Sequence, residues 1–276
     1  MIALRDGRKV AVEHYGDPAG TPAFWFHGAM SSRIEGAYLD GAARELGVRL
    51  LSLDRPGVGG SDPLPGRTVV GYADDVAQVM DALDIDEAAV GGLSNGGMFA
   101  MAVASALPDR VLRAVPVNPS TPIADPAARA ALSRKARLSY AYLLRNPDRV
   151  VAQLERAKPP GRLSTALTKL TNPDAHLYTL PDVAAISTAN VAEVLRQRGS
   201  GYLPAELALV AAPWGFDHRA VQVPVSLVSG DKDGGLSYAR IWATELPHGR
   251  LVVVPGGHGG MPARPVARQV AELLRG

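Results

Sequence analysis

Three residues of types that together perform nucleophilic acyl chemistry occur in this chain: a serine, an aspartate and a histidine. Ser94 lies in residues 92–96, which fit the pattern G-x-S-x-G. A strand-like apolar run, 87–91, precedes the pattern, and a helix-like run, 98–107, follows it. On a sharp strand-to-helix turn the serine hydroxyl projects beyond the sheet, and small neighbours permit the turn. This context predicts that Ser94 is a nucleophile. The pattern alone is also compatible with a glycine-rich connection whose serine has no catalytic role.

A serine nucleophile needs a base that accepts its proton. His258 is the candidate base because it directly follows the apolar run 251–254 and has two glycines on each side. Those glycines let the loop approach the serine closely. The other histidines are assigned no role as a base, and His27 is expected to orient its own loop.

The base needs an acid that fixes its tautomer, and two aspartates follow the strand-like run 223–229. We prefer Asp233, because the chain must first turn away from the strand end before a carboxylate can reach back to His258. Asp231 is expected to cap that turn through the backbone and stays an alternative. The resulting chain order of Ser, Asp and His is that of a nucleophile-elbow enzyme.

Attack of a serine on a carbonyl group generates an oxyanion, which two backbone N–H groups usually hold. One donor is expected from Asn95, at the start of the helix after the serine. The second is expected from the loop after the apolar run 23–26. Within that loop Ala29 is the preferred donor and Met30 is the alternative.

Apolar strands alternate with amphipathic helices along most of the chain. Strands are expected over 23–26, 49–53, 87–91, 112–117, 223–229 and 251–254, and helices over 34–46, 69–83, 98–107, 237–245 and 262–274. This order predicts an α/β protein with a mostly parallel sheet covered on both faces. Ligands of such sheets bind beyond the carboxyl ends of the strands, where Ser94, Asp233 and His258 should converge.

The alternation stops between residues 120 and 217, where only helix-like runs and breakers occur. Helices are expected there over 125–144, 148–157, 164–170 and 182–198. We interpret 120–217 as an inserted helical cap and residues 1–119 with 218–276 as the core domain.

The bulk composition limits the classes of function. With 276 residues, 47% of them hydrophobic, the chain can bury a sizeable core. The formal net charge of +2 gives no reason to expect a nucleic acid or a membrane surface as partner. The absence of cysteine excludes disulfides and a thiol nucleophile, and no cluster has metal-ligand spacing, so no metal or cofactor is expected. No signal-peptide pattern or membrane-span stretch is present, so a cytoplasmic location is expected.

Taken together and in this order, the motifs resemble the α/β-hydrolase superfamily. The resemblance rests on residues 26–28, 54–62, 92–97, 230–233 and 257–258. It implies the α/β-hydrolase fold, with a mostly parallel eight-stranded sheet, helices on both faces and an inserted helical cap. It also implies a Ser94, His258 and Asp233 triad and cofactor-independent esterase, lactonase or aminopeptidase chemistry. Many relatives carry Asp-x-x-x-Pro after the acid strand, and the absence of that proline here keeps Asp231 open.

The sequence therefore predicts a serine hydrolase that cleaves a carboxylic ester, thioester or lactone of a small molecule. An acyltransferase, a lyase or cyclase with the same site, and a non-catalytic ligand-binding protein are the alternatives. Substrate choice should depend on the cap. The expected lining residues are Met30, Tyr140, Trp214 and Phe216, although such aromatic residues also serve simply to pack a cap onto a sheet.

Overall fold

The structure is a computed structural model that describes residues 1–146, 149, 152, 174–197 and 202–276. Within these residues the main sheet has seven strands in the order β3-β5-β4-β6-β7-β8-β9. They are β3 (Val12–Gly16), β4 (Thr21–Phe26), β5 (Val48–Leu53), β6 (Ala88–Leu93), β7 (Val111–Val117), β8 (Val225–Gly230) and β9 (Gly249–Val254). Only β3 runs antiparallel to its neighbour. The prediction of a mostly parallel sheet is confirmed.

The strand number differs from the expected eight. β1 (Ile2–Ala3) and β2 (Lys9–Val10) form a separate two-stranded sheet in the described part of the chain. Ala11, between β2 and β3, donates its N–H to Ser61 Oγ (2.9 Å) and accepts from the N–H of Asp54 (3.0 Å). Because these bonds use the backbone at the junction, the hairpin does not continue into the main sheet.

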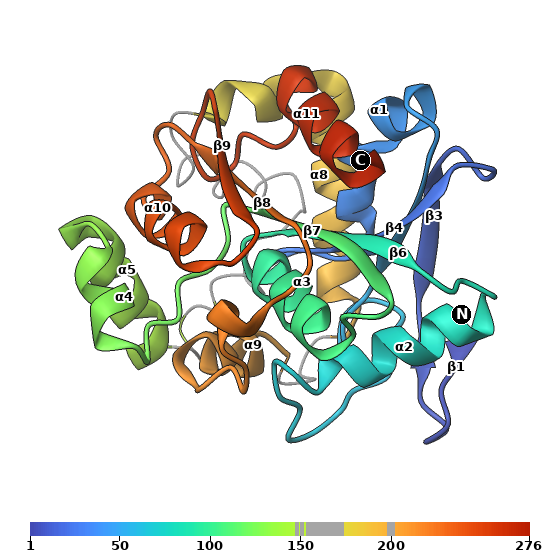
Figure 1. The fold of residues 1–276 in the computed structure, drawn as a ribbon, viewed down its shortest axis with the longest axis horizontal. Helices are drawn as coiled ribbons and strands as arrows, with labels where there is room; N and C mark the ends of the chain where they lie inside the picture. Colours follow the sequence, from blue (N-terminus) through green and yellow to red (C-terminus); the bar gives the residue numbers. More distant parts are fainter. Residues whose placement is uncertain (147–148, 150–151, 153–173, 198–201) are drawn as a thin grey trace.

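Helices cover both faces of the sheet (Figure 1). One face carries α1 (Asp40–Glu45) and α11 (Arg264–Arg275), and the other carries α2 (Tyr72–Ala82), α3 (Asn95–Ala106) and α10 (Leu236–Glu245). Strand β4 shows how both faces are filled: Phe24 and Phe26 enter the core under α2 and α3, while Ala23 and Trp25 enter the core under α1 and α11. Such two-sided burial explains its continuous apolar sequence.

Between β7 and β8 the described residues form helices joined by turns and loops, and none of them forms a strand. This segment contains α4 (Pro126–Ala131), α5 (Arg134–Arg145), η2 (Asp174–Thr179), α8 (Pro181–Val194), η3 (Leu195–Gln197), α9 (Tyr202–Ala211) and η4 (His218–Ala220). The single helix expected over 125–144 is divided, because Leu132 adopts an extended conformation with ψ 145°. The helix expected over 164–170 lies outside the described residues. Of the helix expected over 148–157, only residues 149 and 152 are described.

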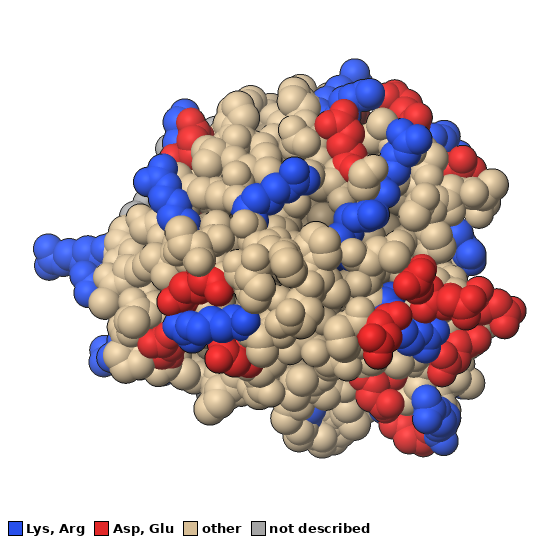
Figure 2. All heavy atoms as spheres, in the orientation of Figure 1, with Lys and Arg blue, Asp and Glu red and all other residues tan. Residues whose placement is uncertain are grey.

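The described surface mixes both signs of charge. Figure 2 shows basic and acidic side chains interspersed on one face, with broad uncharged areas between them. Across the described residues, every helix is too short or too polar to span a bilayer.

Candidate active site

Ser94 occupies a sharp turn between β6 and α3. Its backbone lies at φ 57° and ψ −117°, a conformation that residues with a side chain rarely adopt. The end of β7 and the loop after it hold this turn, because the N–H of Ser94 donates to the carbonyl of Val117 (2.9 Å) and its carbonyl accepts from the N–H of Ser120 (3.1 Å). The surrounding fold thus fixes the strained conformation.

Glycine on the helix side of Ser94 lets the turn pack against the centre of the sheet. A Cβ atom on Gly96 would overlap the carbonyl oxygen of Phe26, at the end of β4. The G-x-S-x-G spacing is therefore required by the close approach of α3 to β4. The same approach brings Gly28 beside Ser94, since a Cβ atom on Gly28 would lie 3.8 Å from Ser94 Cβ.

Asp233 and His258 follow the adjacent strands β8 and β9, and their side chains meet. Nδ1 of His258 lies 2.8 Å from Oδ2 of Asp233, and Oδ1 of Asp233 accepts from the N–H of Gly235 (2.7 Å). The Asp233 side chain is only 5% exposed, whereas that of His258 is 47% exposed. Asp231 instead accepts from the N–H of Gly256 (2.9 Å) and is exposed. Of the two candidate acids, Asp233 is therefore the one in contact with His258.

The two side chains shift each other's pKa in opposite directions. Burial acts to raise the pKa of Asp233, but the charge of His258 and its hydrogen bond outweigh burial, so the pKa is lowered. Partial burial acts to lower the pKa of His258, but the charge of Asp233 and the shared hydrogen bond raise it above its ordinary value. The carboxylate therefore stays ionised and holds Nδ1 as the proton-bearing nitrogen, which leaves Nε2 able to act as a base.

The His258 loop has two polar anchors that sequence reasoning missed. Asn118 accepts from the N–H of Gly230 (2.9 Å) and donates Nδ2 to the carbonyls of Gly257 and His258 (3.2 Å each). It lies at φ 42°, a region where asparagine is tolerated better than most residues. Its position directly after β7 is the sequence signal that could have identified it.

The second anchor is Asp174, in η2. Its carboxylate is buried and accepts from the N–H of Gly257 (3.0 and 3.1 Å) and from the N–H of Gly259 (3.0 Å). A Cβ atom on Gly256 would lie 2.9 Å from Asp174 Oδ1, and one on Gly260 would lie 3.4 Å from it. The glycines around His258 therefore make room for a carboxylate from the inserted segment. No local sequence signal connects Asp174 with this loop.

The loop after β4 is held in a defined conformation. Nδ1 of His27 lies 2.8 Å from the carbonyl oxygen of Gly28, and Nε2 accepts from the N–H of Arg55 (3.2 Å). His27 is fully buried, and burial beside Arg55 lowers its pKa well below the ordinary value, so the ring is neutral. These contacts agree with an orienting role for His27.

Two backbone donors near Ser94 are open. The N–H of Gly28 donates to Glu35 Oε2 (3.2 Å), but the N–H groups of Ala29 and Asn95 have no hydrogen-bond partner among the described residues. Unpaired N–H groups beside a serine are the arrangement that an oxyanion requires.

The four expected lining residues lie in different surroundings. Met30 is half-buried in the loop after β4, and Tyr140 lies on α5 beside Ser120 and Thr121, where burial raises the pKa of its hydroxyl. Trp214 stacks on Phe216, with ring centroids 6.0 Å apart, and meets Trp242 edge-on at 5.9 Å. The described contacts of Trp214 and Phe216 are thus with core aromatic rings, and their contribution to a substrate pocket stays a prediction.

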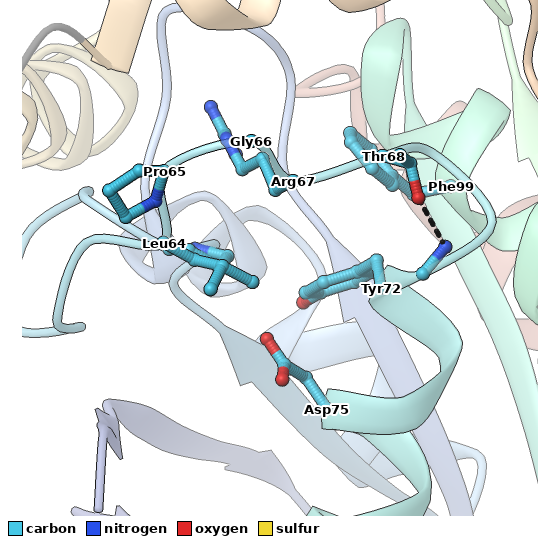
Figure 3. Close-up of a pocket in the computed structure, with 10 residues that line it drawn as sticks. Leu64, Pro65, Gly66, Arg67, Thr68, Tyr72, Asp75 and Phe99 are labelled. Carbon is cyan, nitrogen blue, oxygen red and sulfur yellow. Dashed lines mark hydrogen bonds between the residues drawn. The ribbon is translucent and has the colours of Figure 1, made fainter. Parts of the chain in front are cut away.

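A separate cavity of ≈ 220 Å³ lies between the loop before α2 and the helix itself. Figure 3 shows Arg67, Tyr72 and Asp75 around it, together with the apolar side chains of Leu64 and Phe99. Ser94, Asp233 and His258 are not among its lining residues. No group of three or more metal-ligating side chains occurs in the part of the chain that the structure describes.

Comparison with known proteins identifies the family. A family model described as the alpha/beta hydrolase fold matches residues 26–262. The chain therefore belongs to the α/β-hydrolase-fold family, and the predicted fold class is confirmed.

Curated relatives match parts of the chain. A non-heme chloroperoxidase of Streptomyces lividans is 33% identical over 124 residues, which cover 44% of this chain and 45% of that protein. The 3-oxoadipate enol-lactonase 1 of Acinetobacter baylyi is 31% identical over 101 residues, which cover 37% of this chain and 38% of that protein. The chain thus aligns with less than half the length of these relatives.

A solved structure matches almost the whole chain. A thermophilic esterase from Thermogutta terrifontis superposes with a TM-score of 0.72 at 24% identity and covers 99% of this chain and 95% of its own. At this level of identity the likeness shows the fold alone.

Proposed function

We propose that this protein is a serine hydrolase that cleaves a carboxylic ester, thioester or lactone through an acyl-enzyme at Ser94. The observation that carries the proposal is the 2.8 Å contact between His258 Nδ1 and the buried Asp233, at the sheet edge where the strained Ser94 also lies. A histidine oriented in this way leaves Nε2 free to take a proton. The family membership and the likeness to an enol-lactonase support this class of chemistry.

In the proposed mechanism Ser94 Oγ attacks the carbonyl carbon while His258 Nε2 accepts the hydroxyl proton. The N–H groups of Asn95 and Ala29 stabilise the negative charge that develops on the carbonyl oxygen. His258 then donates its proton to the leaving alcohol, thiol or lactone oxygen. Water deprotonated by His258 attacks the acyl-enzyme, releases the acid and restores Ser94.

We further propose that residues 120–217 act as a cap over the core formed by 1–119 and 218–276. Three described contacts support a cap fixed close to the site. Asp174 holds the His258 loop, Asn190 donates Nδ2 to Ser31 Oγ (2.7 Å), and Gln197 donates Nε2 to the carbonyl of Gly59 (2.8 Å). Each joins the inserted segment to a loop at the carboxyl ends of the strands.

A covalent-labelling experiment tests the proposed nucleophile. The protein is treated with a fluorophosphonate, and adducts are located by intact mass spectrometry and peptide mapping. A single adduct on Ser94, absent in Ser94→Ala, is expected, together with turnover of simple esters or lactones that Ser94→Ala loses. Hydrolysis retained by Ser94→Ala would contradict the assignment. A folded protein that forms no adduct would favour a ligand-binding role.

A further inference from the structure

A buried carboxylate from the inserted segment belongs to a hydrogen-bonded network that reaches the residues at both open N–H groups. Glu206, on α9, has no exposed surface. It accepts from Arg55 Nε (3.2 Å) and Nη2 (2.9 Å), and from Asn95 Nδ2 (3.1 Å). Its Oε1 also lies 2.9 Å from Arg67 Nη1. One glutamate thus joins α9 to the loop after β5, to the loop before α2 and to the residue after Ser94.

Through Arg55, Glu206 is connected to the peptide group between Gly28 and Ala29. Arg55 is fully buried and donates Nη2 to the carbonyl of Gly28 (3.0 Å) and Nη1 to the carbonyl of His27. In a trans peptide the C=O and the following N–H point in opposite directions. Because Arg55 holds the Gly28 oxygen on one side, the N–H of Ala29 is directed to the other side.

Through Asn95, Glu206 is connected to the start of α3. The Asn95 side chain is held at both ends, since Nδ2 donates to Glu206 Oε2 and Oδ1 accepts from Ser120 Oγ (2.6 Å). A side chain fixed at both ends restricts rotation of the backbone that carries the Asn95 N–H. The two open donors, which are 66 residues apart in sequence, therefore share one buried carboxylate.

The positive charges of Arg55 and Arg67 keep the carboxylate of Glu206 ionised. Burial acts to raise its pKa, but the guanidinium groups of Arg55 and Arg67 outweigh burial, so its pKa is lowered. An ionised carboxylate with several donors is a strong and directional anchor. Arg67 also borders the cavity in Figure 3 and contacts neither Asn95 nor Gly28 in the described contacts.

We infer that Glu206 is a positioning residue, through which α9 sets the orientation of both N–H donors of the proposed oxyanion hole. The inference rests on the proposed function. It assigns to the inserted segment a part in the chemical step as well as in covering the site.

The first test is Glu206→Gln, which keeps the shape of the side chain and removes its charge. Loss of an oxyanion donor costs about 10²–10³ in kcat, so loosening both donors should lower kcat about 10- to 100-fold with little change in KM. The rate of fluorophosphonate labelling should fall in proportion. Wild-type kcat in this variant would overturn the inference.

A control variant separates positioning from the general loss of a buried charge. Glu193→Gln makes the same change on α8, where Glu193 pairs with Arg33 (2.6 Å) and has no described contact with either donor. It is expected to keep kcat within about threefold of wild type. A loss as large as that in Glu206→Gln would show a merely structural effect and would overturn the inference.

Hydrogen–deuterium exchange tests the anchoring without catalysis. In Glu206→Gln, peptides that cover 27–30 and 94–97 should exchange faster than in wild type, and Glu193→Gln should leave both unchanged. If the wild type has no hydrolytic activity but these peptides respond, the proposed function fails and the anchoring stands. Unchanged exchange in both peptides would overturn the inference.

A second variant is available if Glu206→Gln does not fold. Asn95→Ala removes the contact with Glu206 but keeps the backbone N–H and leaves no buried charge unpaired. It should lower kcat about 10-fold and increase exchange in 94–97 only. Unchanged kcat and unchanged exchange in Asn95→Ala would contradict the role of this contact.

Discussion

At the scale of single residues, Ser94 combines a strained backbone with an accessible position at a strand end. Residues in such conformations cost about 1–3 kcal/mol each and persist only where the surrounding structure fixes them. Here the bonds to Val117 and Ser120 do so. Because the strain lies in the backbone dihedral angles of Ser94, its energetic cost should not depend on the side-chain hydroxyl group.

This separation predicts different effects on stability for two substitutions. Ser94→Gly should raise the free energy of unfolding by about 1 kcal/mol, because relief of strain exceeds the entropic cost of glycine, about 0.5–1 kcal/mol. Ser94→Ala keeps the strain and should stay within about 0.5 kcal/mol of wild type. Urea unfolding with an unchanged m-value measures both. Equal stability of the two variants would argue against backbone strain at this turn.

The contact between His258 and Asp233 predicts the pH dependence of the site. Asp233 raises the pKa of His258, so His258 stays protonated to a higher pH than an ordinary histidine, whose pKa is about 6.5. Activity that needs neutral His258 should therefore rise with pH and reach half its maximum above about pH 6.5.

Asp233→Asn removes the negative charge, and the pKa of His258 should then fall. An NMR titration of the His258 imidazole in both proteins measures the shift directly. Asp231→Asn is the matched control, because Asp231 contacts Gly256 instead of His258. This variant should leave the pKa of His258 unchanged. A larger shift in Asp231→Asn than in Asp233→Asn would reverse our choice of acid.

At the scale of elements, the short helix η2 fixes a loop of the core. Asp174 accepts hydrogen bonds from Gly257 and Gly259, on either side of His258, and its charge also acts to raise the pKa of His258. A segment inserted between β7 and β8 thus sets the conformation of the loop after β9. The inserted segment and the core should therefore be coupled in stability.

Asp174→Asn tests this coupling. An amide has one acceptor oxygen, and even with that oxygen in the Oδ2 position its NH2 group would face the N–H of Gly257, at a cost of about 1–3 kcal/mol in the free energy of unfolding. The pKa of His258 should fall at the same time. Asp182→Asn, at an exposed position on α8, should change stability by no more than about 0.5 kcal/mol. Thermal or urea unfolding and the NMR titration check both effects, and an Asp174→Asn variant as stable as Asp182→Asn would contradict the coupling.

At the scale of the whole molecule, ion pairs join distant segments away from the site. Arg8, on the N-terminal hairpin, pairs with Asp75 of α2 through Nη1 (3.0 Å) and Nη2 (2.5 Å). The side chains are 14% and 4% exposed, so loss of Arg8 would leave a nearly buried carboxylate unpaired. This pair should support stability without affecting the chemistry at Ser94.

Arg8→Met is expected to lower the free energy of unfolding by about 3 kcal/mol and to leave kcat and KM within about twofold. Arg5 provides the control on the same hairpin: its side chain is 72% exposed and lies 3.8 Å from Asp81. Arg5→Met should cost about 0–1 kcal/mol. Urea unfolding and steady-state kinetics measure both variants, and a loss of activity in folded Arg8→Met would show coupling to the site.

The sequence was sufficient for the order of strands and helices because hydrophobic periodicity and glycine-containing turns are local properties. It placed Ser94, Asp233 and His258 after strands of one parallel sheet, and the carboxyl ends of such strands share an edge. The strand number was predicted less well. The backbone of Ala11 forms hydrogen bonds with Ser61 and Asp54, which are more than 40 residues away in the sequence. The local alternation of apolar and polar residues does not indicate those hydrogen bonds.

What the sequence by itself determined is therefore the α/β framework, the serine turn and the set of strand-end residues around it. Only the tertiary structure decided that Asp233 rather than Asp231 contacts His258, because the direction of a turn after β8 depends on its packing. It also decided the roles of Asp174 and Glu206, whose partners lie 83 and 111 residues or more away. Hydrogen bonds over such separations follow from how the inserted helices pack onto the sheet, and side-chain type and local spacing do not encode that packing.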